Sequence, residues 1–313
     1  MERTKIILDC DPGHDDAVAI MMAAKHPSIE LLGITVVSGN QTLQKTVTNA
    51  LHICQHLNLD VPVYAGSPTP LVKDPIYAEF IHGKSGLDGP VFEPLTKKVE
   101  PMHAVSFIIR TLMRSEGDIT MVTTGPMTNL ALAMRLEPRI VKKIKQVVLM
   151  GGSAGSGNIT PAAEFNIFVD ADAAQIVFKS GLPIVMCGLD VTRKVRCYQE
   201  IIDRMDKLGN KASTLFKEMM EFYNETQLAS FGWVGGPLHD PLTIAYLIDN
   251  SVIETSYCNV SVDNKSDVSY GRTNCDLINF MKKEPNVHVA IDVNVDLFWD
   301  IIESCLALYG TEN

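Results

Sequence analysis

Four aspartates stand within eight residues near the start of the chain, in the segment Asp9-Cys10-Asp11-Pro12-Gly13-His14-Asp15-Asp16. The apolar residues 6–8 before this segment predict a buried strand, and residues 17–24 after it predict a helix. In open parallel α/β sheets, ligands bind at the carboxyl ends of strands. Because four like charges placed there repel one another, we expect a hard divalent cation with oxygen ligands to compensate them.

A purely structural role explains only part of this aspartate cluster. Asp15 and Asp16 fall in the first helical turn, where acids favour the helix dipole, and either could be an N-cap. Asp9 and Asp11 stand two residues apart at the end of an apolar strand, and strand alternation directs both to the same face. Capping does not explain this second pair, so the segment predicts a functional site.

A second polar group follows a later strand, in residues 158–166, where Asn158, Glu164 and Asn166 occur. Amides and a carboxylate can accept or orient several hydroxyls, as a sugar site requires, although simple loop capping is the alternative. The glycine-rich residues 151–157 before them lack the spacing of a dinucleotide or phosphate loop. We therefore expect no such cofactor there.

His239 and Asp240 precede an apolar helix predicted over residues 242–248. Asp240 could be no more than the N-cap of that helix. Because neighbouring side chains point apart, Asp240 could instead face a metal ion while His239 faces another group. His82, in a glycine-flanked loop, is a second histidine candidate.

The composition argues against several classes of protein. A chain of 313 residues with 46% hydrophobic content and a net charge of -10 suits a globular protein with a small-molecule substrate, not a nucleic-acid surface. Seven cysteines without a C-x-x-C motif indicate free thiols in a reducing compartment. No apolar run approaches ~18 residues, and the first strand begins almost at once. We expect a cytoplasmic, soluble protein without a signal peptide or membrane segment.

The predicted elements alternate between strand and helix through the first two-thirds of the chain. We expect strands at residues 5–10, 31–37, 61–64, 119–123, 146–150 and 184–187, and helices at 15–25, 42–57, 102–115, 127–136 and 171–180. This order predicts an α/β fold with a mostly parallel, Rossmann-like sheet and helices on both faces.

The rest of the chain departs from this alternation. Residues 67–101 show little periodicity, and long loops inside compact domains are usually functional or disordered. C-terminal additions follow, with helices predicted at 199–208 and 211–228, a strand at 288–293 and a helix at 296–309. Because no clear linker occurs, we expect a single domain over residues 1–313.

Taken together, these segments resemble the nucleoside hydrolases of the inosine–uridine-preferring type. Residues 9–16 match the family signature D-x-D-P-G-x-D-D. Further blocks match in order at residues 38–42, 82–83, 87–90, 124–126, 149–152, 163–166 and 239–241. The resemblance covers essentially the whole chain and is strongest to bacterial pyrimidine-specific ribonucleoside hydrolases.

The resemblance implies an activity, a cofactor and a set of site residues. The activity is hydrolysis of the N-glycosidic bond of ribonucleosides, such as uridine and cytidine, in nucleoside salvage by a homotetramer or homodimer. One Ca²⁺ is implied, with Asp11 also acting as the base that deprotonates a water. The implied calcium ligands are Asp11, Asp16, the Thr124 carbonyl and Asp240. The implied ribose contacts are Asp15, Asn40, Met150, Asn158, Glu164, Phe165 and Asn166. The implied nucleobase contacts are His82, Gln227, Phe231 and His239.

The chemistry of the reaction agrees with these roles. Positive charge develops on the ribose as the bond breaks, so Asp11 and Asp15 would stabilise it. A pyrimidine has no N7 to protonate, so a donor must reach its ring oxygen or N3. His239 is the natural donor, with His82 as the alternative. Pyrimidine-specific relatives can carry a tyrosine hydroxyl at the position of Phe231, which keeps the ring but lacks the donor.

Other functions remain open at this level. The chain could be a purine-accepting or broad-specificity hydrolase, or a calcium-dependent nucleoside-binding protein without activity. A haloacid-dehalogenase-type phosphatase also opens with a strand and D-x-D. That class requires Thr or Val at the position of Gly13, and we find no convincing lysine or acidic pair to complete its site.

Overall fold

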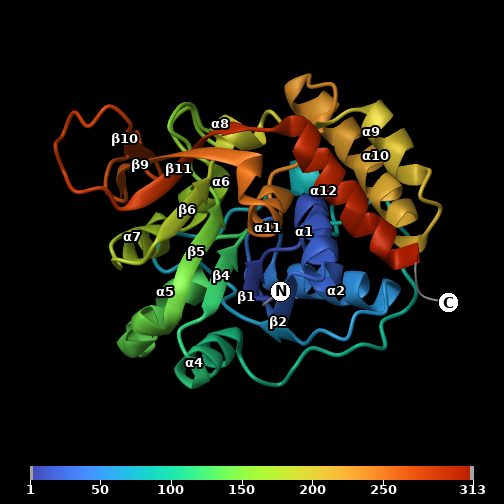
Figure 1. The fold of residues 1–313 in the computed structure, drawn as a ribbon, viewed down its shortest axis with the longest axis horizontal. Helices are drawn as coiled ribbons and strands as arrows, with labels where there is room; N and C mark the ends of the chain where they lie inside the picture. The colour runs from blue at the N-terminus through green and yellow to red at the C-terminus, as the bar shows by residue number, and fades with distance from the viewer. Residues whose placement is uncertain (1–2, 311–313) are drawn as a thin grey trace.

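A nine-stranded sheet runs through the centre of the structure, a computed structural model that describes residues 3–310 (Figure 1). The strand order is β10-β9-β11-β6-β5-β4-β1-β2-β3. The pairings of β9 with β10 and with β11 are antiparallel, and the other pairings in this sheet are parallel. The predicted α/β fold with a mostly parallel sheet is therefore confirmed.

The strands of the main sheet are β1 (Thr4–Cys10), β2 (Ile29–Val36), β3 (Val63–Ala65), β4 (Ile119–Thr123), β5 (Ile144–Met150), β6 (Ile184–Cys187), β9 (Ile253–Val262), β10 (Thr273–Asp276) and β11 (Val287–Val293). A separate two-stranded sheet consists of β7 (Arg196–Cys197) and β8 (Gly236–Pro237). The α-helices are α1 (His14–Lys25), α2 (Leu43–His56), α3 (Glu79–His82), α4 (Ala104–Arg114), α5 (Thr128–Leu136), α6 (Phe165–Val169), α7 (Ala171–Phe178), α8 (Leu189–Thr192), α9 (Gln199–Asp206), α10 (Lys211–Phe231), α11 (Pro241–Ile248) and α12 (Val295–Ala307).

Helices cover both faces of the sheet because consecutive side chains of its strands, which point to opposite faces, are apolar. In β1, Ile6 and Leu8 pack into a core with α1, α2, α10, α11 and α12. Ile7 packs on the opposite face with α4, α5 and α7, which Figure 1 shows on the other side of the strands. Each of these three side chains is fully buried, which contributes roughly 2 kcal/mol apiece relative to exposure.

The position of β1 in the sheet brings separate loops together. β1 lies between β2 and β4, and all three run in the same direction. Their carboxyl ends therefore meet at one edge, where residues 11–13, 37–42 and 124–127 follow the strands. The backbone N–H of Thr124 donates to the carbonyl of Asp9 at 2.9 Å, which fixes the loop after β4 against the end of β1.

The C-terminal third contains elements that the sequence analysis did not predict. The strands β9 and β10 were missed, although buried Cys258, Val260 and Val262 alternate with less buried residues as in a one-sided strand. Earlier in the chain, the sequence analysis also missed the helices α3, α6 and α8, because their four or five residues are too few to show a helical period.

Across residues 3–310, no helix combines the length and apolar character needed to span a membrane.

Candidate active site

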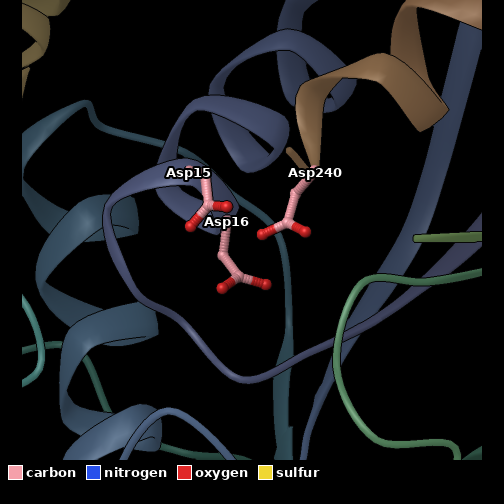
Figure 2. Close-up of side chains that lie close together, drawn as sticks. All are labelled: Asp15, Asp16 and Asp240. Carbon is pink, nitrogen blue, oxygen red and sulfur yellow. The ribbon is translucent and has the colours of Figure 1, made fainter. Parts of the chain in front are cut away.

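The aspartates of α1 and α11 converge at the carboxyl edge of the sheet. Asp15 and Asp16 lie in the first turn of α1, and the backbone N–H of Gly13 donates to Asp16 Oδ2 at 3.0 Å. Figure 2 shows the carboxylates of Asp15, Asp16 and Asp240 pointing toward one another. One carboxylate oxygen of each lies within 4.8 Å of the others, so together they could hold a metal ion.

Asp240 does not act as a helix cap. It occupies the N-cap position of α11, but within residues 3–310 its side chain accepts no capping hydrogen bond. The carboxylate is instead buried beside Asp15 and Asp16, from which it is separated by more than 220 positions in the sequence. The N-cap alternative for Asp240 is therefore wrong, and the long-range convergence favours a functional role.

Asp11 lies next to this group and is held by the loop after β2. The backbone N–H of Asn40 donates to Asp11 Oδ2 at 2.6 Å, whereas Asp11 Oδ1 is buried without a hydrogen-bond partner among the described residues. A Cβ atom at Gly39 or Gly125 would collide with this carboxylate, so both positions require glycine. The close approach leaves Asp11 Oδ1 buried against Gly125 without a hydrogen-bond partner among the described residues.

The electrostatics of the site favour a bound cation. Burial raises the pKa of Asp11 and of Asp240 well above the usual range, and raises the pKa of Asp15 to about 7. Each of these shifts is increased by the charges of neighbouring aspartates. The side-chain atoms available to coordinate a metal are all carboxylate oxygens, which suits Ca²⁺ or Mg²⁺ rather than zinc. The residues therefore fit a hard divalent cation.

Asp9 is engaged within the sheet. Its Oδ1 accepts hydrogen bonds from Thr35 Oγ1 at 2.6 Å and from Asn129 Nδ2 at 2.8 Å. Burial raises the pKa of Asp9 to about 7, and these two hydrogen bonds oppose that shift. Asp9 therefore supports the strand ends, and the cation would be shared by the other aspartates.

A cavity of about 260 Å³ opens beside the aspartates. Most of the predicted contact residues line it, namely Asp15, Asn40, His82, Thr124, Met150, Asn158, Glu164, Phe165, Asn166, Gln227, Phe231, His239 and Asp240. Asp11 and Asp16, which are also buried, are not among the lining residues. The structure thus brings together residues from six separate parts of the sequence, at positions 15, 40, 82, 124, 150–166 and 227–240.

The amides and the carboxylate of residues 158–166 line the cavity. Glu164 caps α6, because its oxygens accept from the backbone N–H groups of Asn166 at 2.9 Å, Ile167 at 3.1 Å and Gly152 at 2.9 Å. Asn158 Oδ1 accepts from the N–H of Phe165 at 2.8 Å. The capping alternative is therefore correct for these two residues, although both also line the cavity.

His82, His239 and Gln227 also line the cavity. His239 Nδ1 lies 2.7 Å from Thr192 Oγ1, and burial lowers the pKa of His239 to about 3. The side chain of Gln227 is buried, and among the described residues its Oε1 has no hydrogen-bond partner. Phe231 ends α10 and is 40% exposed at the cavity. These residues therefore offer polar atoms to a ligand in the cavity, and the aromatic ring of Phe231 is among the lining side chains.

The sequence analysis missed several lining residues, among them Arg193 and Trp233. The Arg193 guanidinium donates to the carbonyls of Ser156 at 3.1 Å and Gly157 at 2.6 Å, and lies 5.9 Å from the Trp233 ring centre. Arg193 thus anchors the glycine-rich loop. Trp233, one of only two tryptophans in the chain, was the available signal, because it follows Phe231 closely.

Comparison with known proteins identifies the family. The family model described as inosine-uridine preferring nucleoside hydrolase matches residues 6–300. The chain belongs to this family. It is 54% identical to the pyrimidine-specific ribonucleoside hydrolase RihB of Escherichia coli strain K12 over 309 residues, which are 99% of each chain. This nucleoside hydrolase is therefore an enzyme, a glycosidase, and the phosphatase and non-catalytic alternatives are wrong.

Solved structures of nucleoside hydrolases share its fold. A purine-preferring ribonucleoside hydrolase from Gardnerella vaginalis superposes with a TM-score of 0.92 at 34% identity, covering 98% of this chain and 100% of that one. The plant nucleoside hydrolase PpNRh1 superposes with a TM-score of 0.91 at 30% identity, covering 97% and 99%. The names of these relatives state different base preferences, pyrimidine for RihB and purine for the Gardnerella vaginalis enzyme. The shared fold alone therefore does not determine which base is preferred.

Proposed function

We propose that this nucleoside hydrolase cleaves pyrimidine ribonucleosides, such as uridine and cytidine, to free base and ribose with the help of one Ca²⁺. The observation that carries the proposal is the convergence of buried, mutually repelling carboxylates beside a cavity lined by amides, carboxylates and histidines. The 54% identity to a pyrimidine-specific enzyme supports the choice of base.

Asp11, Asp16, the Thr124 carbonyl and Asp240 would hold the cation. When bound, Ca²⁺ would act as a template and mild Lewis acid for the ribose 2′ and 3′ hydroxyls and a water. Asp15 and Asn40 line the cavity beside this group and would hydrogen-bond the same hydroxyls. Ca²⁺ is preferred over Mg²⁺ because it accepts flexible, carboxylate-rich oxygen sites, whereas Mg²⁺ demands octahedral geometry with several waters.

Asp11 supplies the base of the reaction. Its unpartnered Oδ1 would accept a proton from the attacking water, whose oxygen forms the new bond to C1′ of the ribose. The C1′–N1 bond breaks, and its electron pair leaves with the base. As positive charge develops on the sugar, the ionised carboxylates of Asp11 and Asp15 stabilise it electrostatically.

His239 would assist the departing pyrimidine. The Thr192 hydroxyl, 2.7 Å from Nδ1, can donate to that nitrogen, which leaves the proton of a neutral His239 on Nε2. The Nε2–H can then donate to the pyrimidine as negative charge develops on it. At the opposite end, Asn158, Glu164 and Asn166 would hold the 5′-hydroxyl, with Met150 and Phe165 lining the sugar.

The testing experiment is a panel of uridine, cytidine, inosine, adenosine and 2′-deoxyuridine, each scored for free sugar and free base. We expect the two pyrimidine ribonucleosides to be cleaved with the highest kcat/KM. A site built to bind a hydroxyl rejects an analogue without it by roughly 10⁴-fold, so 2′-deoxyuridine should react very slowly. Faster cleavage of inosine or adenosine would refute the pyrimidine preference and leave a purine-accepting hydrolase.

The proposal also includes properties that follow from the resemblance alone. We propose that the enzyme acts in nucleoside salvage in the cytoplasm, as a single-domain chain in a homotetramer or homodimer. Size measurement by light scattering on the purified protein tests the assembly. A monomer at micromolar concentration would contradict it.

A further inference from the structure

His14 forms a hydrogen-bonded chain that leads from the surface loop after α3 to the cavity. His14 is fully buried, and its ring stacks near those of Phe222 and Tyr223 at centroid distances of 5.5 Å. Its Nε2 lies 2.8 Å from the backbone carbonyl of Asp88, and its Nδ1 lies 3.1 Å from Nδ1 of His82. His82 lines the cavity, whereas His14 does not.

The direction of these hydrogen bonds can be assigned from their end point. A backbone carbonyl only accepts, so His14 Nε2 must carry a hydrogen. A neutral His14 then has a lone pair on Nδ1, and the facing Nδ1 of His82 must be the donor. Full burial supports the neutral form, because a charged imidazolium ring removed from water is costly. A neutral His82 with its hydrogen on Nδ1 has a lone pair on Nε2.

One further contact would require the opposite tautomer of His82, with a lone pair on Nδ1. The backbone N–H of His14 lies 3.4 Å from His82 Nδ1 and would need a lone pair on that nitrogen. Two bare ring nitrogens would then face each other at 3.1 Å, unless His14 carried a second proton in a fully buried position. The shorter contact and the burial both favour the Nδ1–H form of His82.

We propose that His14 is a positioning residue that holds His82 in the Nδ1–H tautomer, so that His82 offers a hydrogen-bond acceptor to the cavity. His82 would then bind an N–H of the pyrimidine, namely N3–H of uridine or the 4-amino group of cytidine. It would not donate the proton to the leaving base, and His239 keeps that role. The identity of the bound N–H rests on the proposed function, whereas the tautomer does not.

The direct test is nuclear magnetic resonance of the calcium-loaded protein labelled with ¹⁵N-histidine. The chain has eight histidines, and the signals of His82 are assigned by their loss in His82→Gln. We expect Nδ1 of His82 to carry the hydrogen and Nε2 to be bare. Detection of Nε2–H on His82 in the unmodified protein would overturn the proposal, whether or not the protein cleaves any nucleoside.

Two substitutions of similar size separate positioning from packing. Asn at position 14 can still present an acceptor oxygen to His82, whereas Leu cannot. We expect His14→Asn to keep the Nδ1–H signal of His82 and His14→Leu to shift His82 toward Nε2–H. His52→Leu is the matched control, because His52 also stacks on an aromatic ring, that of Phe92, at 4.8 Å and does not line the cavity. An unchanged His82 tautomer in His14→Leu would refute the positioning role.

Kinetics supply the second readout. In His14→Leu we expect KM for uridine to rise about tenfold, because the base loses its acceptor. For p-nitrophenyl riboside, which has no N–H to bind, KM should change less than about threefold. His14→Asn should stay near the parent on both substrates. Equal losses on both substrates would indicate general disruption and contradict the proposal. If neither substrate is cleaved even by the parent, the proposed function fails, while the His82 signals still decide the tautomer.

Discussion

The side-chain amide of Asn166 donates a hydrogen bond to the backbone carbonyl of Thr124 at 2.7 Å. Asn166 is a proposed ribose contact that lines the cavity, and the Thr124 carbonyl is a proposed cation ligand. A carbonyl oxygen has two lone pairs, so this hydrogen bond leaves one available to a cation. The Thr124 hydroxyl also donates to Asp16 Oδ1 at 2.8 Å. The two sides of the site are therefore fixed relative to each other before any ligand binds.

The first prediction concerns the metal. We expect one Ca²⁺ per chain in purified protein, and we expect Asp240→Asn to weaken calcium binding at least tenfold, because a charged ligand becomes neutral. At a calcium concentration 100 times the Kd, binding should stabilise the parent by about 2.7 kcal/mol. Elemental analysis and calcium titration measure both effects.

The matched control for the metal is Asp292→Asn. Asp292 is an exposed aspartate, paired with Lys194 at 2.8 Å on the surface. This substitution should leave the calcium content and affinity unchanged. Stoichiometric zinc in the parent, or full activity after chelation, would contradict the assignment.

The second prediction concerns the dependence of stability on pH. The folded-state pKa of Asp15 is raised from 3.8 to about 7, so the folded chain keeps a proton that the unfolded chain has lost. The stabilisation from this group is full below about pH 4 and is lost as the pH rises through about 7. In chelator, the free energy of unfolding should therefore fall over this window, by about 1.4 kcal/mol per pH unit for one such group.

Calcium should flatten this decline, because it stabilises the ionised carboxylate. Denaturant unfolding at pH 5, 6 and 7, with chelator or with calcium, measures the difference. Asp9 and Glu164, whose pKa values burial also raises to about 7, contribute in both conditions and cancel in the comparison. Parallel pH profiles with and without calcium would show that neither Asp15 nor the neighbouring Asp11, Asp16 and Asp240, whose pKa values are also raised, is linked to the metal.

The third prediction concerns the leaving group. If His239 donates to the departing pyrimidine, His239→Ala should lower kcat on uridine by roughly 10²-fold or more. On p-nitrophenyl riboside the loss should be less than about fivefold, because nitrophenolate departs without a donor. Phe231 adds no hydroxyl that could replace His239. Equal losses on both substrates would mean that His239 only shapes the cavity or supports Asp240.

The sequence predicted the parts of the site that local patterns encode. The signature of residues 9–16 combined a strand, a turn and a helix, so Asp11, Asp15 and Asp16 could be placed at a strand end. It did not reveal that Asp9 would turn to Thr35 and Asn129, because those partners come from the neighbouring strand and from α5. Contacts between distant elements leave no local pattern.

The same limit explains the missed residues at the base end. Arg193 reaches the cavity by packing under the glycine-rich loop, and His14 acts through His82, which lies 68 residues away. The position of His14 within the aspartate-rich segment, between Gly13 and Asp15, gave no distinguishing signal. Phe231 was expected near a helix end and does end α10. Whether it affects the base preference stays a prediction, as does the ligand set of the cation.

The most direct test of the account is the release of ribose from uridine by the calcium-loaded parent and by Asp11→Asn, followed with a reducing-sugar assay. Asp11 is the proposed base and a proposed ligand, and its Oδ1, like Oδ1 of Asp15 and Oδ2 of Asp9, is buried without a hydrogen-bond partner among the described residues. We predict steady release of ribose and uracil in equal amounts by the parent, and a loss of about 10²–10⁴-fold in turnover by a folded Asp11→Asn protein. Turnover of Asp11→Asn within tenfold of the parent, or no ribose from the calcium-loaded parent, would contradict the account.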